Sequence, residues 1–147
     1  MGCSISLIRK KVKQELRTKH QEIRTESDDC RQSKLFLWGP DPLRAEWLLS
    51  LRRKDLKLLV EVVTGHCSLN YHSKKIKLST TPTCQSCYEE DETAEHFLCE
   101  CPSYLNARLR AFGSEFLHAD NLIDISLKSV LNYIKSTGRL TIADENS

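Results

Sequence analysis

The sequence predicts a mainly α-helical protein that forms one small helical domain. Apolar residues recur at steps of three and four through most of the 147 residues, which is the spacing of amphipathic helices. No segment alternates apolar and polar residues over the length of a strand, so no sheet is expected. The apolar content of 39% is enough for a hydrophobic core, although a thin one.

The first segment, residues 1–27, is predicted to be one basic amphipathic helix over residues 4–26. Lys and Arg fill most positions outside its apolar stripe, which consists of Ile5, Ile8, Val12, Leu16 and Ile23. Because the stripe is narrow, this helix is expected to need a partner surface, and a protein partner through residues 4–26 is one candidate. The polar sequence that starts at Ser27 ends the helix.

The second segment, residues 28–79, is predicted to hold three further helices. A Gly-Pro-Asp-Pro turn leads into the first, which begins near Pro42 and has a face formed by Leu43, Trp47 and Leu51. Ser50 is expected to cap the second helix, which Gly65 ends. The apolar face of this second helix consists of Leu56, Leu59, Val60 and Val63. A third, short helix is predicted over residues 67–77.

A cysteine-rich stretch follows, and after it the sequence predicts two more helices. Pro102 opens the first of them, whose inward residues are Leu105, Leu109 and Phe112. The second has Ser126 or Asp124 as its cap and Gly138 at its end. Its apolar face consists of Ile123, Leu127, Val130, Leu131 and Ile134. Residues 141–147 are predicted to be a disordered tail.

The cysteine-rich stretch carries the strongest chemical signal in the sequence, the spacing Cys84-x2-Cys87-x8-His96-x4-Cys101. The Cys-x2-Cys turn brings two sulfurs together, and a short helix between the cap Thr93 and Pro102 presents the imidazole and the third sulfur. Three thiols and one imidazole are typical of a closed tetrahedral zinc site, which leaves no open position for catalysis. Residues 80–140 are therefore predicted to be a zinc-binding region with two C-terminal helices. The Cys-x2-Cys turn is compatible with one short hairpin.

Alternatives stay open at this stretch. Cys99 is the alternative fourth ligand, but Cys101 is preferred, because His-x4-Cys is the usual spacing and Cys99 falls on the apolar side of the helix. A metal-free alternative treats the cysteines as small buried side chains. Glu92 and Glu95 are either acceptors for the N–H of His96 or solvated carboxylates.

Charge is distributed unevenly along the chain. Residues 1–80 carry 17 Lys and Arg against 9 Asp and Glu, a net charge of +8, whereas residues 81–147 carry 5 against 11, a net charge of −6. The basic half predicts contact with RNA or DNA, and the alternative is a Lys-rich solvated surface. Because the cysteine-rich loop is acidic, the predicted nucleic-acid contacts are Arg52, Arg53, Lys54, Lys57, Lys74, Lys75 and Lys77.

The neighbouring residues His66 and Cys67 do not predict catalysis. Adjacent side chains on a helix point apart, so they cannot act as base and nucleophile, and a helix-start or packing role is expected. Seven cysteines without a secretory signal favour an intracellular location, in the nucleus or the cytoplasm, over a disulfide framework. No apolar run is long enough for a transmembrane helix.

The combined motifs of residues 28–140 resemble a known family. They include Thr64-Gly-His-Cys-Ser-Leu-Asn70 with His72, and the Cys-Cys-His-Cys spacing that is followed by Pro102 and Arg108. Together they are similar to the C-terminal tail of the polyproteins encoded by Jockey-like non-LTR retrotransposons. That tail follows the reverse transcriptase and, often, a ribonuclease H domain.

The resemblance implies a zinc-binding, nucleic-acid-associated element, with catalysis located in the upstream domains. The ligands that it implies are Cys84, Cys87, His96 and Cys101. The chain contains no reverse-transcriptase or ribonuclease H signature. It is therefore expected to be a fragment or a standalone descendant of such an element, without enzymatic activity.

The first residues support a different hypothesis. The sequence Met1-Gly-Cys-Ser-Ile-Ser6 fits the pattern for N-myristoylation of Gly2, with Cys3 as a candidate for palmitoylation. The following basic residues, Arg9, Lys10, Lys11 and Lys13, would strengthen such an anchor. The chain would then be an acylated membrane-associated adaptor, and without acylation no membrane contact is expected. A protein–protein interaction fragment without activity of its own is the third hypothesis.

Overall fold

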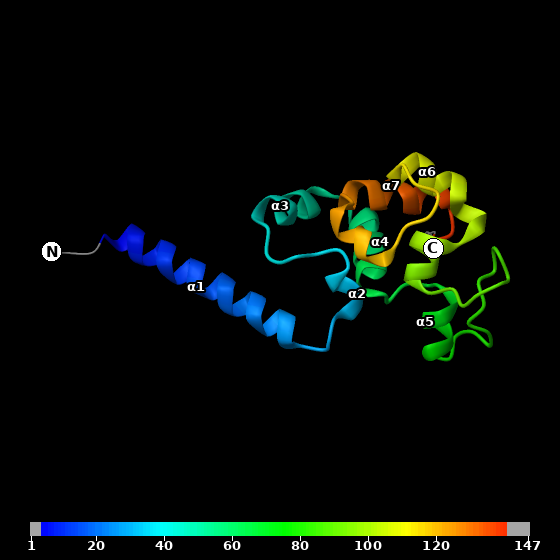
Figure 1. Ribbon diagram of the computed structural model, residues 1–147, viewed down its shortest axis with the longest axis horizontal. Helices are drawn as coiled ribbons and strands as arrows, with labels where there is room; N and C mark the ends of the chain where they lie inside the picture. The colour runs from blue at the N-terminus through cyan, green and yellow to red at the C-terminus, as the bar shows by residue number, and fades with distance from the viewer. Residues whose placement is uncertain (1–3, 141–147) are drawn as a thin grey trace, which may run out of the picture.

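The computed structural model describes residues 4–140, and its mainly α-helical architecture confirms the predicted fold class (Figure 1). The only β-structure among these residues is one isolated antiparallel bridge between Thr83 and Asp91. The predicted disordered tail, residues 141–147, lies outside the described part of the chain. The candidate acylation sites Gly2 and Cys3 lie outside it as well.

Helix α1 (Ile5–Glu26) has the predicted length and buries none of its side chains. Figure 1 shows it projecting away from the other helices. Its last turns hold it to the protein, because the Arg24 guanidinium donates to the carbonyl oxygens of Leu37 at 2.9 Å and Ser33 at 3.3 Å. Ser33 belongs to the short helix α2 (Arg31–Lys34). The apolar stripe of α1 is therefore left exposed.

Helix α3 (Pro42–Ser50) begins at proline as predicted. Its cap is Asp41, whose carboxylate accepts from the backbone N–H groups of Leu43 and Arg44. The predicted capping role of Ser50 is wrong. Ser50 is the last residue of α3, and its hydroxyl donates to the carbonyl of Trp47. Extended residues separate it from the start of the next helix, beyond the reach of a capping side chain.

Helix α4 (Arg53–Thr64) buries Leu58, Leu59, Val62 and Val63. The predicted face was rotated, because Val60 is 50% exposed while Leu58 and Val62 face the core. Gly65 ends α4 as predicted, in the left-handed conformation with φ +76°, which favours glycine. The next helix, α5 (Asn70–Lys75), is shorter than the predicted range of residues 67–77.

A 3-10 turn, η2 (Pro102–Tyr104), leads into α6 (Leu105–Phe112). The prediction of Leu109 as an inward residue is wrong, because its side chain is 44% exposed and α6 instead buries Ala107 and Arg108. After a second 3-10 segment, η3 (Ala119–Asp124), helix α7 (Leu127–Thr137) completes the fold. Of the two proposed caps for α7, the hydroxyl of Ser126 is the one that accepts, from the backbone N–H of Ser129. The predicted apolar face of α7 is buried, as at Val130, Leu131 and Ile134.

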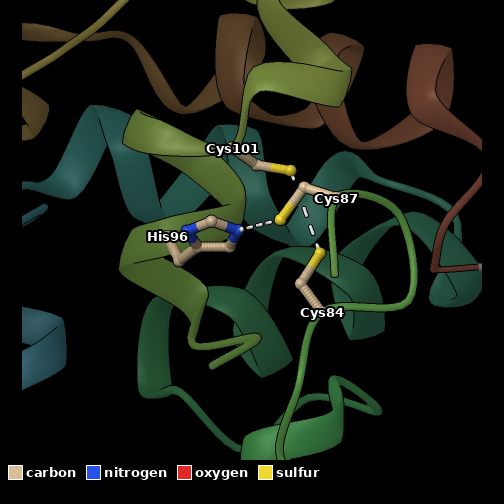
Figure 2. A group of neighbouring side chains, drawn as sticks. All are labelled: Cys84, Cys87, His96 and Cys101. Carbon is tan, nitrogen blue, oxygen red and sulfur yellow. Dashed lines mark hydrogen bonds between the residues drawn. The ribbon is translucent and has the colours of Figure 1, made fainter. Parts of the chain in front are cut away.

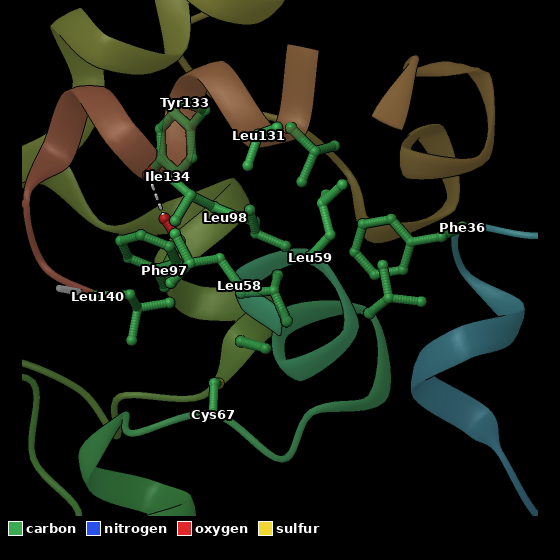
Figure 3. Close-up of a cluster of buried hydrophobic side chains, with 14 of the residues drawn as sticks. Phe36, Leu58, Leu59, Cys67, Phe97, Leu98, Leu131, Tyr133, Ile134 and Leu140 are labelled. Carbon is green, nitrogen blue, oxygen red and sulfur yellow. Dashed lines mark hydrogen bonds between the residues drawn. The ribbon is translucent and has the colours of Figure 1, made fainter. Parts of the chain in front are cut away.

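The hydrophobic core lies between α4, α7 and a helical turn, η1 (His96–Glu100) (Figure 3). Phe97 and Leu98 of that turn are fully buried, and the ring centroids of Phe97 and Tyr133 lie 5.2 Å apart. The Tyr133 hydroxyl donates to the carbonyl of Phe97 and so ties α7 to the turn. The packing of Phe97 and Leu98 in the core therefore fixes the position of the neighbouring residue, His96.

Candidate metal centre

The structure brings the four predicted ligands together. One ligand atom from each of Cys84, Cys87, His96 and Cys101 lies within 4.8 Å of the others (Figure 2). The sulfurs of Cys84 and Cys101 are 3.8 Å apart, and the sulfur of Cys87 is 3.4 Å from Nε2 of His96. Cys87 is half-buried, and the other three residues are buried.

These distances fit a tetrahedral site of the size that zinc prefers. Two sulfurs that are each about 2.3 Å from one zinc ion, at tetrahedral angles, lie about 3.8 Å apart. The separation between Cys84 and Cys101 equals that value. A sulfur and an imidazole nitrogen on the same ion lie about 3.6 Å apart, close to the observed distance from Cys87 to His96. The residues present therefore fit a single metal ion that would be held by all four side chains.

Backbone hydrogen bonds close the turn that carries Cys84 and Cys87. Beside the bridge between Thr83 and Asp91, the N–H of Cys84 donates to the carbonyl of Glu90 at 2.7 Å. The N–H of Tyr88 donates back to the carbonyl of Cys84 at 2.9 Å. The predicted hairpin is thus reduced to a single bridge, and the turn beside it holds both thiols in the cluster.

Burial and backbone hydrogen bonding act in opposite directions on the pKa values of the Cys87 and Cys101 thiols. Burial raises the pKa of Cys87, but hydrogen bonds from the backbone of Glu89 and Glu90 and from the thiols of Cys84 and Cys101 together outweigh burial, and the pKa lies below its usual value. Burial instead raises the pKa of Cys101 to about 12. Cys101 therefore keeps its proton at neutral pH in the metal-free protein, and metal binding must expel that proton. Metal affinity consequently falls as the pH is lowered.

A π-helical turn places His96 and Cys101 on the same side. The N–H of Cys101 donates to the carbonyl of His96, five residues earlier, at 2.8 Å. In an α-helix, side chains five residues apart differ by about 140° around the axis. The wider π turn reduces this angle, so both side chains point into the cluster (Figure 2). Thr93 caps the turn as predicted, because its hydroxyl accepts from the N–H of His96 at 3.0 Å.

The imidazole of His96 directs Nε2 to the cluster and Nδ1 to two carboxylates. Nδ1 lies 3.5 Å from Glu90 and 4.0 Å from Glu100, and neither contact is aligned as a hydrogen bond. Small rotations of these exposed side chains would let either one accept the Nδ1 proton, which fixes the tautomer that a metal-bound imidazole needs. Of the two alternatives for Glu92 and Glu95, acceptors for His96 or solvated carboxylates, the first is wrong, because the carboxylates that flank Nδ1 are those of Glu90 and Glu100.

Cys99 lies outside the cluster, in the hydrophobic core. Its side chain is fully buried among residues such as Phe97 and Leu98. Burial raises the pKa of its thiol to about 12. Cys99 therefore behaves as a small apolar side chain, and the geometry favours Cys101 as the fourth ligand.

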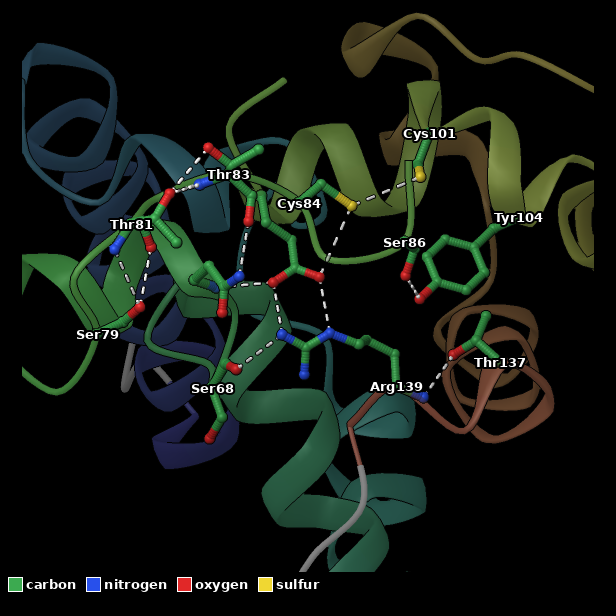
Figure 4. A network of polar contacts seen from close by, with 12 residues as sticks. Ser68, Ser79, Thr81, Thr83, Cys84, Ser86, Cys101, Tyr104, Thr137 and Arg139 are labelled. Atoms are coloured by element: carbon green, nitrogen blue, oxygen red, sulfur yellow. Dashed lines mark hydrogen bonds and ion pairs between the residues drawn. The ribbon is translucent and has the colours of Figure 1, made fainter. Parts of the chain in front are cut away.

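Glu92 is neither solvated nor an acceptor for His96, and it is fully buried beside the cluster. Figure 4 shows the polar network to which Cys84 and Arg139 belong. Its carboxylate accepts from the Arg139 guanidinium at 2.7 Å and 2.5 Å and from the backbone N–H of Asn70 at 2.8 Å. One of its oxygens lies 3.8 Å from the sulfur of Cys84. Glu92 therefore joins α5, the cysteine loop and the end of α7. Sequence reasoning missed this pair, because Arg139 lies 47 residues away.

Arg108 is a second buried cation near the cluster, and its side chain is 0% exposed. Its guanidinium donates to the carbonyl oxygens of Cys101 at 2.5 Å and Glu115 at 2.6 Å. The same group lies 5.5 Å from the ring centroid of Phe116. Arg108 thus fixes the carbonyl of a ligand residue against the loop after α6, and its place in the core explains why Leu109 points outward.

The predicted nucleic-acid contacts are all exposed, and they form two separate groups. Arg52, Arg53, Lys54 and Lys57 lie at the start of α4, and Lys74, Lys75 and Lys77 lie at and just beyond the end of α5. The length of α4, about 18 Å, separates the first group from the loop that leads to α5. Lys57 is 3.8 Å from Glu61, and the ammonium of Lys75 lies over the ring of Tyr71.

His66 and Cys67 do not form a reactive pair. Cys67 is buried, and burial raises the pKa of its thiol to about 11, whereas His66 is exposed. The ring of His66 instead packs against the ring of His72, with 5.1 Å between the centroids. Burial, followed by the charges of His66 and Lys75, lowers the pKa of His72. These contacts fit the predicted packing role.

The fold and the cluster define a class of protein: a small, mainly helical chain in which a largely buried set of three cysteines and one histidine has metal-binding geometry. Comparisons with protein-family models, with curated proteins and with solved structures return no match to the chain. Within residues 4–140, no helix has the length and apolar character to cross a bilayer.

Proposed function

We propose that the chain is a non-catalytic zinc-binding module that associates with RNA or DNA. The observation that carries the proposal is the cluster of Cys84, Cys87, His96 and Cys101, whose ligand atoms lie within 4.8 Å of one another. Three sulfurs and one imidazole favour zinc over calcium or magnesium, which prefer oxygen ligands. Bound zinc would occupy all four ligands, so the site would stabilise the fold and leave no position for a reacting water.

Metal analysis of the purified chain tests the site. We expect one zinc ion for each chain, and cobalt substitution should give an absorption band of the intensity typical of three thiolates. Cys99→Ala should keep both signals, because Cys99 packs in the core. Cys101→Ala should lose a thiolate from the cobalt spectrum. Loss of the metal in Cys99→Ala, with retention in Cys101→Ala, would reverse the assignment of the fourth ligand.

The exposed basic side chains support the nucleic-acid part of the proposal. Zinc with three thiolates leaves the metal site with a charge of about −1, and exposed carboxylates such as Glu89 and Glu90 surround it. Phosphate would therefore avoid the metal loop and approach the basic residues at the start of α4 and the end of α5. The apparent affinity would depend strongly on salt, because bound phosphates release counterions.

Salt-dependent binding measures this contact directly. We expect the full chain to bind single-stranded RNA or DNA more weakly as salt rises, and the double substitution Arg52→Gln with Arg53→Gln should lower the salt slope by about 1.4. Lys128→Gln, an exposed cation of the acidic half, is the matched control and should leave the slope unchanged. Absence of salt-dependent binding to either polymer would refute the nucleic-acid role and leave the metal site intact.

An origin from the tail of a Jockey-like retrotransposon polyprotein belongs to the same proposal. The spacing of the four ligands and the motif around His66 and His72 support it. Sequencing of the genomic locus tests this origin. A reverse transcriptase reading frame, intact or decayed, is expected directly upstream, and an unrelated flanking sequence would contradict the origin.

A further inference from the structure

Helix α1 carries an apolar stripe that no part of the described chain covers. Its members are exposed by 49% to 69%: Ile5, Ile8, Val12, Leu16 and Ile23. At 100° for each residue, these five side chains fall within about 80° of the helix circumference. The contacts of α1 with the protein lie elsewhere, because Gln21 rests against Gly39 and Arg24 donates to Leu37. Gln21 and Arg24 are each separated from the middle of the stripe by more than about 100° around the helix axis.

The charges beside the stripe are unequal along α1. Residues 5–14 contain Arg9, Lys10, Lys11 and Lys13 and no carboxylate, whereas all three glutamates of the helix lie at or beyond Glu15. The partner of this first half must therefore offer an apolar interior together with negative charge. A second copy of the chain would bring the same cations, and α1 has seven cations against three carboxylates. A nucleic acid would meet the cations and leave Ile8 and Val12 in water.

We propose that the first half of α1 binds the surface of an anionic lipid membrane. The helix lies in the interface, with Ile5, Ile8 and Val12 inserted among the acyl chains. The long side chains of Arg9 and Lys13 extend to the lipid phosphates. A basic amphipathic helix in which polar side chains outnumber apolar ones is suited to this position, and it does not cross the bilayer. The contact is independent of the metal site and requires no acyl group, unlike the membrane contact considered from the sequence alone.

Vesicle co-sedimentation of the full chain tests the proposal. The protein is made in bacteria, so Gly2 carries no acyl group, and the vesicles contain phosphatidylcholine with or without phosphatidylserine. We expect binding only to the vesicles with phosphatidylserine, and this binding weakens as salt rises. Ile8→Glu should weaken it by at least about tenfold. Leu7→Glu adds the same charge to an exposed residue outside the stripe and should change binding by less than about threefold.

Three results would overturn the proposal. The first is absence of binding to anionic vesicles at low salt. The second is an equal loss in Ile8→Glu and Leu7→Glu, which would show that charge alone acts and that the stripe does not insert. The third is a dimer in sedimentation equilibrium that Ile8→Glu converts to a monomer, which would assign the stripe to a second copy. Zinc content, measured in parallel, should stay at one ion for each chain in every variant and so separates this result from the metal-site test.

Discussion

Chelation of the proposed zinc ion is expected to abolish the cooperative unfolding transition of the purified chain. Structural zinc contributes about 10–16 kcal/mol in finger peptides, whereas a small domain has a total stability of about 5–15 kcal/mol. The cluster here also fixes the turn that carries Phe97 and Leu98, which are fully buried core residues. Loss of the ion therefore removes both the ligand bonds and the support for the core. Circular dichroism during a thermal scan, before and after chelation, measures the effect.

Single substitutions make the same prediction specific to the ligands. Cys84→Ser should behave like the chelated protein, because serine is a poor zinc ligand and Cys84 has no exposure to solvent. Cys30→Ser is the matched control, since Cys30 is exposed and lies outside the cluster, and the melting temperature of this variant should stay within about 2 °C of the parent. A chelated protein with an unchanged melting temperature would contradict the structural role of the metal.

The sequence predicts the ligands well because their spacing is local. Cys84 and Cys87 share one turn, and His96 and Cys101 share another, so short-range backbone rules place each pair. The same rules could not predict the π turn, because an α-helix and a π-helix differ by one residue in the hydrogen bond that closes the turn. The prediction of Cys101 rather than Cys99 as the fourth ligand nevertheless agrees with the structure, because Cys99 packs with its apolar neighbours in the core.

Predictions that depended on tertiary packing were less successful. Ser50 has a high propensity to cap a helix, but the chain begins α4 only after Arg52, and the Ser50 hydroxyl donates to the carbonyl of Trp47 instead. Arg108 faces the core because its guanidinium donates to the carbonyl oxygens of Cys101 and Glu115. The spacing of apolar residues in α6 could not predict these contacts. The apolar stripe of α1 was predicted correctly, yet periodicity alone could not indicate that the stripe would be exposed.

Removal of Arg139 is expected to destabilise the protein by about 3–5 kcal/mol, because it leaves the carboxylate of Glu92 buried and uncompensated. Glu92 has no exposure to solvent, and it accepts two hydrogen bonds from Arg139 beside the sulfur of Cys84. Arg139→Met keeps much of the side-chain length and removes the charge. Urea unfolding of the zinc-loaded protein measures the loss as a lower midpoint at unchanged slope.

A double variant of Glu92 and Arg139 shows how much of the lost stability comes from the unpaired charge and how much from the altered side-chain shape. Glu92→Gln combined with Arg139→Met removes both charges, so it should be more stable than Arg139→Met alone, which still buries an unpaired carboxylate. Lys57→Met breaks the exposed pair of Lys57 and Glu61 and is the control, with an expected change below about 0.5 kcal/mol. If Arg139→Met were no more harmful than this control, the stabilising role of the pair of Glu92 and Arg139 would be contradicted. Strict additivity of the two substitutions would likewise contradict the pairing, because two groups that share buried hydrogen bonds must be coupled.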